Sequence, residues 1–401
     1  MAHNTEYLAN STGVDVLLAA PLTGSRKRRR NILGCIKELT NPHFGGNIVK
    51  RTTAAGVASL ACATLLTSPA TASAAARPEI GDVQQVMDEL AKDTAVVGVI
   101  GEMFYDGKRI GRGSAGSRLI GGKGGKIPSD SRYRAWSLTK GMTSAVISQL
   151  VEEGKLAFDD KLGDLLPWVV EKDLVLRADE ITVDHLLKHT SGIPDFGGKL
   201  GLFDLTYHSP IDLLKTSRGL PREQDPGEKF SYSSTGYVLL GLIIEEKTRS
   251  SLDQAFAKRL WKPLGMTSTY LPAKPDHRIK GPHGHGYYPD EKGRLRDTDR
   301  QNATNAWAAG SVISTAKDLA AFQRAQAKNR PPQEQPGTCL ASAPRGSGPG
   351  SLAQVFTTQD GRLQLAVNTT LKVANHTADG YADKVTQAAE KLLCSTPDIR
   401  G

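Results

Sequence analysis

The chain has 401 residues, of which 39% are hydrophobic and 23% are charged, a balance typical of a globular protein with a large buried core. Residues 1–76 hold eight Lys and Arg against three acidic residues, so they carry +5 of the net charge of +9 and leave +4 for the other 325 residues. No basic stripe with interleaved aromatic residues runs along the chain, and we therefore expect no nucleic-acid partner.

Residues 50–76 have the features of a secretory signal. Lys50 and Arg51 supply positive charge, and residues 54–67 form an uncharged run of small and apolar residues. Ala72-Ser73-Ala74 then offers an A-x-A cleavage site. The apolar run is shorter than the roughly 20 residues that a membrane-spanning helix needs. We therefore expect a secreted protein without a stable membrane anchor.

Residues 1–49 precede the natural start of such a signal, and we interpret them as the product of a start placed too far upstream. The expected organisation is a leader over residues 1–76 and one domain over residues 77–401. Beyond the leader the chain has two cysteines, Cys339 and Cys394. Export would permit a disulfide between them, and two unpaired thiols are the alternative. The sequence does not predict the oligomeric state.

The expected domain opens with a helix over residues 80–92, because its apolar residues recur at helical spacing. A run rich in β-branched and aromatic residues predicts a strand over residues 95–105. Asp106-Gly107 is a hairpin turn signal, and a second strand near residues 109–116 follows it.

Helices dominate the middle of the chain, and strands return near its end. Apolar periodicity predicts helices over residues 137–153, 182–188, 237–247 and 315–327. The end of the chain predicts a hairpin of strands 352–358 and 363–370 and a closing helix over 382–393. The early and late strands must then pair with each other. We expect an α+β fold in which helices flank one antiparallel sheet, with an all-helical insert between its strands.

Ser137 and Lys140 are the first candidates for chemistry. A serine at a helix start is usually only a helix cap. Here Ser137 and Lys140 are three residues apart, so they share one face of the expected helix. A neighbouring amine can take or orient the serine proton, which turns the hydroxyl into a nucleophile.

Tyr232 is the second candidate, at an expected strand-to-helix corner. Beside a serine and a cation, a tyrosine can act as a general base. The alternative is a partly buried tyrosine whose hydroxyl bonds to the backbone. Neither Tyr232 nor the serine and lysine pair is specific by itself.

Several segments together are far more specific. They are residues 136–144 (WSLTKGMTS), 187–196 (LKHTSGIPDF), 226–241 (PGEKFSYSSTGYVLLG), 263–266 (PLGM) and 309–319 (AGSVISTAKDL). In this order they resemble the class C β-lactamase and D-alanyl-D-alanine carboxypeptidase family of serine hydrolases, the penicillin-recognising enzymes. The resemblance spans about residues 82–395 and implies a β-lactamase/transpeptidase-like fold.

The resemblance implies a role for each matching residue. Ser137 would be the acylated nucleophile, Lys140 would assist proton transfer, and Tyr232 would activate Ser137 and later the deacylating water. Ser234 stands where the family usually has an Asn that contacts the substrate amide. His189 begins a His-Thr-Ser-Gly segment that, in the family, closes a helix and supports the fold.

The third family element departs from its pattern. The family has Lys or His, then Thr or Ser, then Gly on the strand that lines the site, with Pro-Gly a few residues later. Counting back from Pro349-Gly350 puts Pro344 at the cationic position, and shifting the frame by one puts Arg345 there. We expect Arg345 to bind a substrate carboxylate and the amide of Ser347 to join that of Ser137 in an oxyanion hole.

His283 and His285, with His277, raise the question of a metal site. Their short loop spacing offers no clear third ligand, so we expect a solvated loop without a metal. The resulting expectation is a secreted serine hydrolase that needs no cofactor and forms a covalent acyl-enzyme with an amide or ester carbonyl of a small peptide, β-lactam or ester. A D-alanyl-D-alanine carboxypeptidase is preferred to a β-lactamase-like enzyme, because the Tyr232 element and the export signal fit a cell-wall target. The alternative is a weak or inactive relative that binds cell-wall peptide or a partner protein.

Overall fold

The computed structural model describes residues 82–275, 278–328 and 338–394. The expected leader and His277 lie outside this part of the chain. The α-helices are α1 Val83–Leu90, α2 Leu138–Glu152, α3 Leu162–Leu165, α4 Pro167–Glu171, α5 Val183–Leu187, α6 Pro210–Arg218, α7 Ser234–Thr248, α8 Leu252–Phe256, α9 Ala316–Lys328 and α10 Asn375–Cys394. Short helical turns are η1 Ile120–Gly122, η2 Ala257–Trp261 and η3 Trp307–Ala309.

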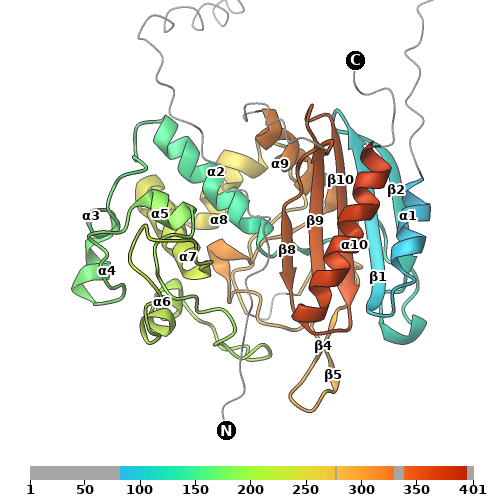
Figure 1. The fold of residues 1–401 in the computed structure, drawn as a ribbon, viewed down its shortest axis with the longest axis horizontal. Coiled ribbons are helices and arrows are strands. Elements are labelled where there is room, and N and C mark those ends of the chain that lie inside the picture. Colours follow the sequence, from blue (N-terminus) through green and yellow to red (C-terminus); the bar gives the residue numbers. More distant parts are fainter. Residues whose placement is uncertain (1–81, 276–277, 329–337, 395–401) are drawn as a thin grey trace, which may run out of the picture. The chain divides into compact units, whose positions relative to one another are not determined.

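The strands form one main antiparallel sheet and two small ones (Figure 1). They are β1 Val96–Tyr105, β2 Lys108–Gly116, β3 Tyr133–Arg134, β4 Tyr287–Pro289, β5 Leu295–Asp297, β6 Ile313–Ser314, β7 Leu340–Ser342, β8 Arg345–Gly348, β9 Ser351–Thr358 and β10 Leu363–Leu371. The main sheet has the order β2-β1-β10-β9-β7, and β8 also pairs with β9. The β1–β10 pairing joins the early strands to the late ones, which confirms the predicted sheet and the α+β fold class.

Local sequence explains both hairpins of this sheet. The β1–β2 turn has positive φ at Asp106 (47°) and Gly107 (78°), as a two-residue turn that matches the twist of the strands requires. The strands of the second hairpin, β9 and β10, read as predicted, and β9 is buried along almost its whole length.

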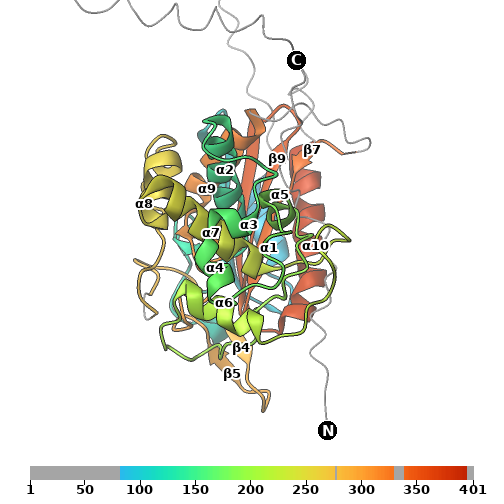
Figure 2. The same ribbon diagram turned by 90° about the vertical axis from the view of Figure 1, so that its left-hand side faces the viewer.

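Helices cover both faces of the sheet. Helices α1 and α10 cover one face, where Val99, Met103 and Phe356 share a buried core with Met87 and Val385. The other face packs against α2, α9 and the insert, and the turned view brings the insert helices in front of the sheet (Figure 2). Alternating residues of each strand therefore enter two different cores.

The insert is built around α7. Five of its apolar side chains are fully buried, so this helix is buried on all sides: Val238, Leu239, Leu240, Ile243 and Ile244. A Cβ on Gly241 would lie 2.6 Å from that of Ala308, so a glycine there lets η3 approach closely. Besides helices, the insert carries the small sheets β3–β6 and β4–β5, whose strands are too short to show a periodic pattern.

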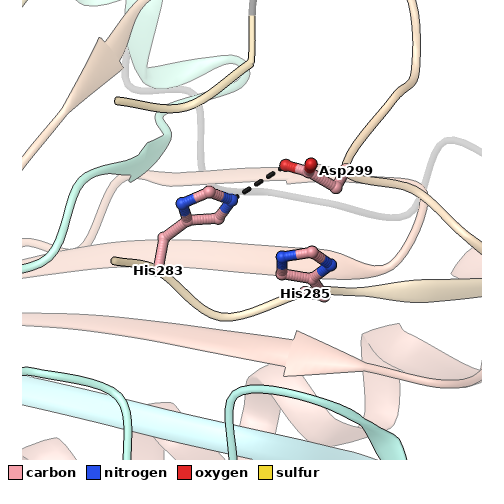
Figure 3. A group of neighbouring side chains, drawn as sticks. All are labelled: His283, His285 and Asp299. Atoms are coloured by element: carbon pink, nitrogen blue, oxygen red, sulfur yellow. Dashed lines mark hydrogen bonds and ion pairs between the residues drawn. The ribbon is translucent and has the colours of Figure 1, made fainter. Parts of the chain in front are cut away.

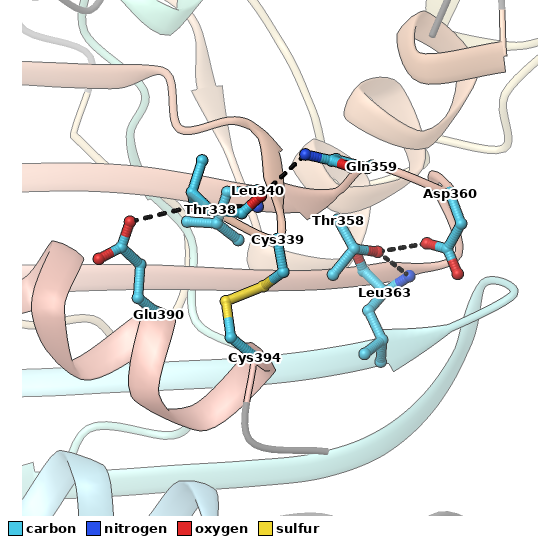
Figure 4. Close-up of a disulfide and its surroundings, with 9 residues drawn as sticks. All are labelled: Thr338, Cys339, Leu340, Thr358, Gln359, Asp360, Leu363, Glu390 and Cys394. Carbon is cyan, nitrogen blue, oxygen red and sulfur yellow. Dashed lines mark hydrogen bonds between the residues drawn. A yellow bond between two sulfur atoms is a disulfide. The ribbon is translucent and has the colours of Figure 1, made fainter. Parts of the chain in front are cut away.

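A disulfide joins Cys339, just before β7, to Cys394 at the end of α10 (Figure 4). Beside it, the N–H of Gln359 donates to the carbonyl of Cys339, and the hydroxyl of Thr338 donates to Glu390 of α10. Of the two alternatives that the sequence left open, the structure has the paired one. In the described residues, no helix has the length and apolar character to cross a membrane.

Candidate active site

Ser137 lies at the tight turn that leads into α2. Its side chain makes no capping hydrogen bond, so the role of Ser137 is not that of an ordinary helix cap. The residue before it, Trp136, has a φ of 50°, which is strained for a residue with a side chain. The indole of Trp136 donates to the hydroxyl of Ser351 at 2.8 Å, a contact that ties the turn to β9.

Two polar side chains converge on the Ser137 hydroxyl, and a third contacts one of them. The hydroxyl of Tyr232 lies 2.8 Å from Ser137 Oγ, and Lys140 Nζ lies 3.4 Å from the same atom. Lys140 Nζ is also 3.5 Å from the hydroxyl of Ser234. Residues from α2 and from the start of α7, about 95 positions apart in the chain, thus meet at one point.

Burial and a carbonyl fix Lys140 in place. Its side chain is only 2% exposed, and Nζ donates to the carbonyl of Ala309 in η3 at 2.8 Å. The ammonium also lies 4.8 Å from the centre of the Tyr232 ring. The contacts with Ala309 and Ser234 hold the amine of Lys140 beside Ser137. From this position the amine can exchange a proton with the Ser137 hydroxyl.

His189 holds Tyr232 from behind. The backbone N–H of Ser231 donates to the carbonyl of His189 at 2.7 Å, and that of Ser233 donates to its Nδ1 at 3.0 Å. The His189 ring stacks on the Tyr232 ring with centroids 4.5 Å apart. Burial, with the charge of Lys140, lowers the pKa of His189 to about 3, so the ring stays neutral.

Sequence reasoning assigned His189 to the support of the fold, and it does close α5. It missed the support given to Tyr232, because those contacts join residues more than 40 positions apart. The sequence carries no signal for this support. The structure shows it, together with a φ of 57° at His189, just after α5.

Asp195 anchors the start of α7. Its carboxylate accepts the N–H of Ser234 at 3.2 Å and that of Gly197 at 3.0 Å. Burial raises the pKa of Asp195, while the hydrogen bond from Gly197 and the charge of Lys140 act in the opposite direction. This carboxylate caps α7 from a distant loop and so fixes where the Ser234 side chain lies.

Strand β8 forms the opposite wall of the site. A Cβ on Gly346 would lie 2.2 Å from the carbonyl oxygen of Ala135 and 2.8 Å from the nitrogen of Ser137. Only a glycine lets β8 come this close to the turn. The proline of the Pro349-Gly350 turn and the positive φ of Gly350 (77°) close the hairpin to β9.

The hydrogen-bond pattern shows which amides of β8 face outward. The N–H of Val355 in β9 donates to the carbonyl of Pro344, and in an antiparallel pair such bonded positions recur at every second residue. Gly346 and Gly348 therefore bond to β9, while the N–H of Ser347 points away from it. In the described part of the chain, neither the Ser347 N–H nor that of Ser137 has a protein acceptor.

Arg345 is not part of this wall, which corrects the role expected for its side chain. Its guanidinium lies 3.3 Å from the carboxylate of Asp379 in α10. Its partner across the strands, Gln354, donates to Thr386 of α10, so this position faces the other side of the sheet. The frame with Pro344 at the cationic position is the one that the structure has. Pro344, Gly346 and Gly348 then share the face toward Ser137, and none of them carries a charge.

Comparisons with known proteins show the family to which the chain belongs. Residues 83–378 match the family model described as Beta-lactamase. Penicillin-binding protein 4 of Amycolatopsis lactamdurans is 33% identical over 184 residues, 46% of this chain and 47% of that protein. A putative D-alanyl-D-alanine carboxypeptidase of Escherichia coli K12 is 30% identical over 132 residues, 32% of this chain and 30% of that one. The chain therefore matches less than half the length of these relatives.

Among solved structures, the D-stereospecific amidohydrolase from Streptomyces sp. has the same fold. It superposes with a TM-score of 0.63 and 26% identity, over 80% of this chain and 100% of that one. The matched family model spans well over half of the chain. The chain belongs to the Beta-lactamase family of penicillin-recognising serine hydrolases.

Proposed function

We propose that this chain is a secreted serine hydrolase that attacks an amide or ester carbonyl with Ser137 and passes through a covalent acyl-enzyme. One observation carries the proposal: Ser137 Oγ lies 2.8 Å from the Tyr232 hydroxyl and 3.4 Å from Lys140 Nζ. These are the distances at which a base can remove the serine proton as the oxygen attacks.

Each step of the proposed reaction uses a group already in place. Tyr232 takes the proton of Ser137 while Oγ bonds to the carbonyl carbon, and Lys140 stabilises the negative charge on the tyrosine oxygen. The amides of Ser137 and Ser347 donate to the developing oxyanion. The protonated Tyr232 then gives its proton to the leaving group. In the second half, the deprotonated Tyr232 takes a proton from the water whose oxygen bonds to the acyl carbon. It returns this proton to Ser137 Oγ as the bond between Oγ and the acyl carbon breaks and the acid leaves.

The uncharged face of β8 supports a substrate class. A C-terminal carboxylate of a peptide needs a cation, and Pro344 stands where the family has Lys or His. We therefore favour neutral amides and esters of D-amino acids as substrates. The name of the Streptomyces protein, a D-stereospecific amidohydrolase, points to the same class. Acyl-D-alanyl-D-alanine peptides and β-lactams, which carry a carboxylate, are the slower candidates. Ser234, whose hydroxyl lies 3.5 Å from Lys140 Nζ, would bond the substrate amide in this proposal.

Matched substrates test this preference. A D-alanyl peptide that ends in an amide should be hydrolysed with a kcat/KM at least about tenfold higher than the same peptide with a free carboxylate. The carboxylate loses its water in the site without gaining a bond to a cation, and such a bond is worth roughly 1.5–3 kcal/mol. Pro344→Lys should narrow or reverse that ratio. Equal rates for both peptides in the wild type would remove the proposed substrate class and leave the nucleophile untouched.

Secretion rests on two features of the chain. Residues 50–76 have the composition of a signal peptide, and the Cys339–Cys394 disulfide belongs to an oxidising compartment. N-terminal sequencing of the protein from a culture medium should find a start near residue 75. A protein retained in the cytoplasm with its leader intact would contradict the proposal.

A binding role without turnover is the second candidate, and the uncharged β8 face favours it too. A protein without the cation that contacts the substrate carboxylate can still bind a peptide although it hydrolyses it too slowly to act as an enzyme. Hydrolysis of a reporter ester by the wild type, and not by Ser137→Ala, decides for the enzyme. Binding of cell-wall peptide without hydrolysis of any ester or amide would decide for the binder.

A further inference from the structure

A second cluster of polar side chains lies at the base of the β4–β5 hairpin. His283 and His285 precede β4, and Asp299 follows β5, so the hairpin brings them together (Figure 3). Each offers one ligand atom, and these three atoms lie within 4.8 Å of one another. His283 is buried, and the other two are partly buried. The sequence alone suggested no third ligand here, because Asp299 lies beyond the hairpin.

The hydrogen bonds of His283 point to a cation. Its Nδ1 lies 2.7 Å from the carbonyl oxygen of Gly281, and its Nε2 lies 2.8 Å from Oδ1 of Asp299. Both nitrogens thus face acceptors, but a neutral imidazole has only one N–H. If the Nδ1–H serves the carbonyl, the lone pair of Nε2 faces the carboxylate, and a metal ion between these two atoms would bond to both.

His285 has the outer contact that metal-binding histidines have. Its Nδ1 lies 2.8 Å from the carboxylate of Asp297, which leaves Nε2 for a ligand bond. A carboxylate or carbonyl on the second nitrogen fixes the ring and makes the first nitrogen a better ligand. His283 and His285 both have this arrangement, and their rings are parallel, with centroids 5.1 Å apart.

We propose that Nε2 of His283, Nε2 of His285 and a carboxylate oxygen of Asp299 bind a Zn²⁺ ion. Two imidazoles and one carboxylate suit Zn²⁺, whereas Mg²⁺ and Ca²⁺ prefer oxygen ligands alone. Bonds of about 2.1 Å in a tetrahedron place ligand atoms about 3.4 Å apart. The Nε2–Oδ1 pair at 2.8 Å therefore opens slightly, and ligand atoms that lie up to 4.8 Å apart close in by up to about 1.4 Å.

The surroundings support such an ion. The carboxylates of Asp297 and Asp299 attract the ion. They do no more than offset the nearby charges of Arg118 and Arg134, so the imidazole nitrogens supply the rest of the binding. Arg118 and Arg134 donate to the backbone carbonyls of His283 and Asp299, so the segments that carry these ligands are fixed.

The position of the site indicates a structural role. The segment around Gly286 packs on the Pro349-Gly350 turn, and a Cβ on Gly286 would lie 2.0 Å from the carbonyl oxygen of Gly350. That turn joins β8 to β9, and β8 lines the proposed active site. Zn²⁺ would thus tie the base of the β4–β5 hairpin and support the turn against which it packs.

Titration of the full chain, without a histidine tag and after treatment with a chelator, tests the site. Isothermal titration with Zn²⁺ should give one site per chain with a Kd below about 10 µM. Co²⁺ in its place should give the visible absorption bands of a four-coordinate ion. Zn²⁺ should also raise the midpoint of thermal unfolding. None of these readouts depends on hydrolytic activity.

Matched variants separate this site from general binding by histidines. His285→Ala and Asp299→Asn should each weaken Zn²⁺ at least about 100-fold, and Asp297→Asn, which alters only the outer contact, about 10- to 100-fold. His208→Ala, a histidine 3.9 Å from Asp204 elsewhere on the chain, should bind Zn²⁺ as the wild type does. Circular dichroism checks that each variant is folded. Binding weaker than about 100 µM, or equal binding by Asp299→Asn, would overturn the proposal.

Discussion

His189 shows how a single residue sets the chemistry beside it. Its carbonyl and Nδ1 hold the backbone on both sides of Tyr232, and its ring stacks on the tyrosine. The ring is buried, and Nε2 has no hydrogen-bond partner in the described residues. A charged imidazole is therefore disfavoured in the fold. Tyr232, the base of the proposed reaction, is thus supported by a neutral histidine ring.

This neutrality predicts a pH dependence of stability. The pKa of His189 in the fold, about 3, lies below its ordinary value of about 6.5, so the unfolded chain binds the extra proton more readily. The stabilisation is complete above about pH 6.5 and is lost as the pH falls toward 3. Between pH 7 and pH 5 the free energy of unfolding should fall by about 2 kcal/mol from this residue.

His189→Asn tests this prediction. Asparagine tolerates the positive φ and keeps an acceptor near the Nδ1 position, but it does not titrate. Urea unfolding at pH 7 and at pH 5 should show a difference smaller by about 2 kcal/mol in the variant. An unchanged difference would contradict the account of His189.

The site residues differ in how far the sequence could predict them. Ser137 and Lys140 share a helix face at a spacing of three, so local pattern was enough to pair them. Tyr232 required the family segments, since nothing local connects it to Ser137. The role expected for the Arg345 side chain was wrong, because side chains alternate along a strand. A shift of one residue in the frame moves a side chain to the opposite face of the sheet.

At the scale of elements, the close approach of β8 to the Ser137 turn is the tightest constraint. Gly346→Ala would place a methyl group 2.2 Å from the Ala135 carbonyl oxygen, and backbone cannot yield as a flexible side chain can. β8 must then move away from Ser137, which separates the two amides of the proposed oxyanion hole. We expect kcat/KM for a reporter ester to fall at least about 100-fold.

Gly380→Ala is the matched control for that substitution. Gly380 lies on the exposed side of α10, and a Cβ there meets nothing within 4 Å. Activity should stay unchanged, and the free energy of unfolding should rise by up to about 1 kcal/mol because alanine favours a helix. If Gly346→Ala were as active as Gly380→Ala, β8 would not form the wall of the site.

The long elements were predictable and the short ones were not. Helices α2, α7 and α9 and the strands β1, β2, β9 and β10 have a clear period or composition. The strands of β3–β6 and β4–β5 have two or three residues each and are held by contacts with distant parts of the chain. Asp299, the third ligand of the proposed Zn²⁺ site, was missed for the same reason, since a hairpin with no sequence signal brings it to His283.

At the scale of the whole molecule, the last described residues close the fold. The Cys339–Cys394 disulfide fixes the end of α10 to the start of β7, across 55 positions of the chain. The sequence correctly predicted that early and late strands share one sheet, because neither pair can bury both faces alone. It left the pairing of the two cysteines open, because the sequence does not show their distance in space.

Removal of this disulfide should lower stability more than activity. In the double variant Cys339→Ser/Cys394→Ser, we expect the free energy of unfolding to fall by about 2–4 kcal/mol, since the unfolded chain is no longer constrained. Urea unfolding of both proteins measures the difference, and the ester assay at 20 °C should stay within about twofold of the wild type. Equal stability would show that the disulfide does not constrain the unfolded chain.

Peptide mapping by mass spectrometry, after brief reaction with an activated p-nitrophenyl ester, shows which residue is the nucleophile. We expect close to one acyl group per chain, located on Ser137, and none in Ser137→Ala. Tyr232→Phe should acquire the group at least about 100-fold more slowly, because the base is lost. Hydrolysis of the ester with the acyl group on another residue, or equal acylation of Ser137→Ala, would contradict the assignment of Ser137 as the nucleophile.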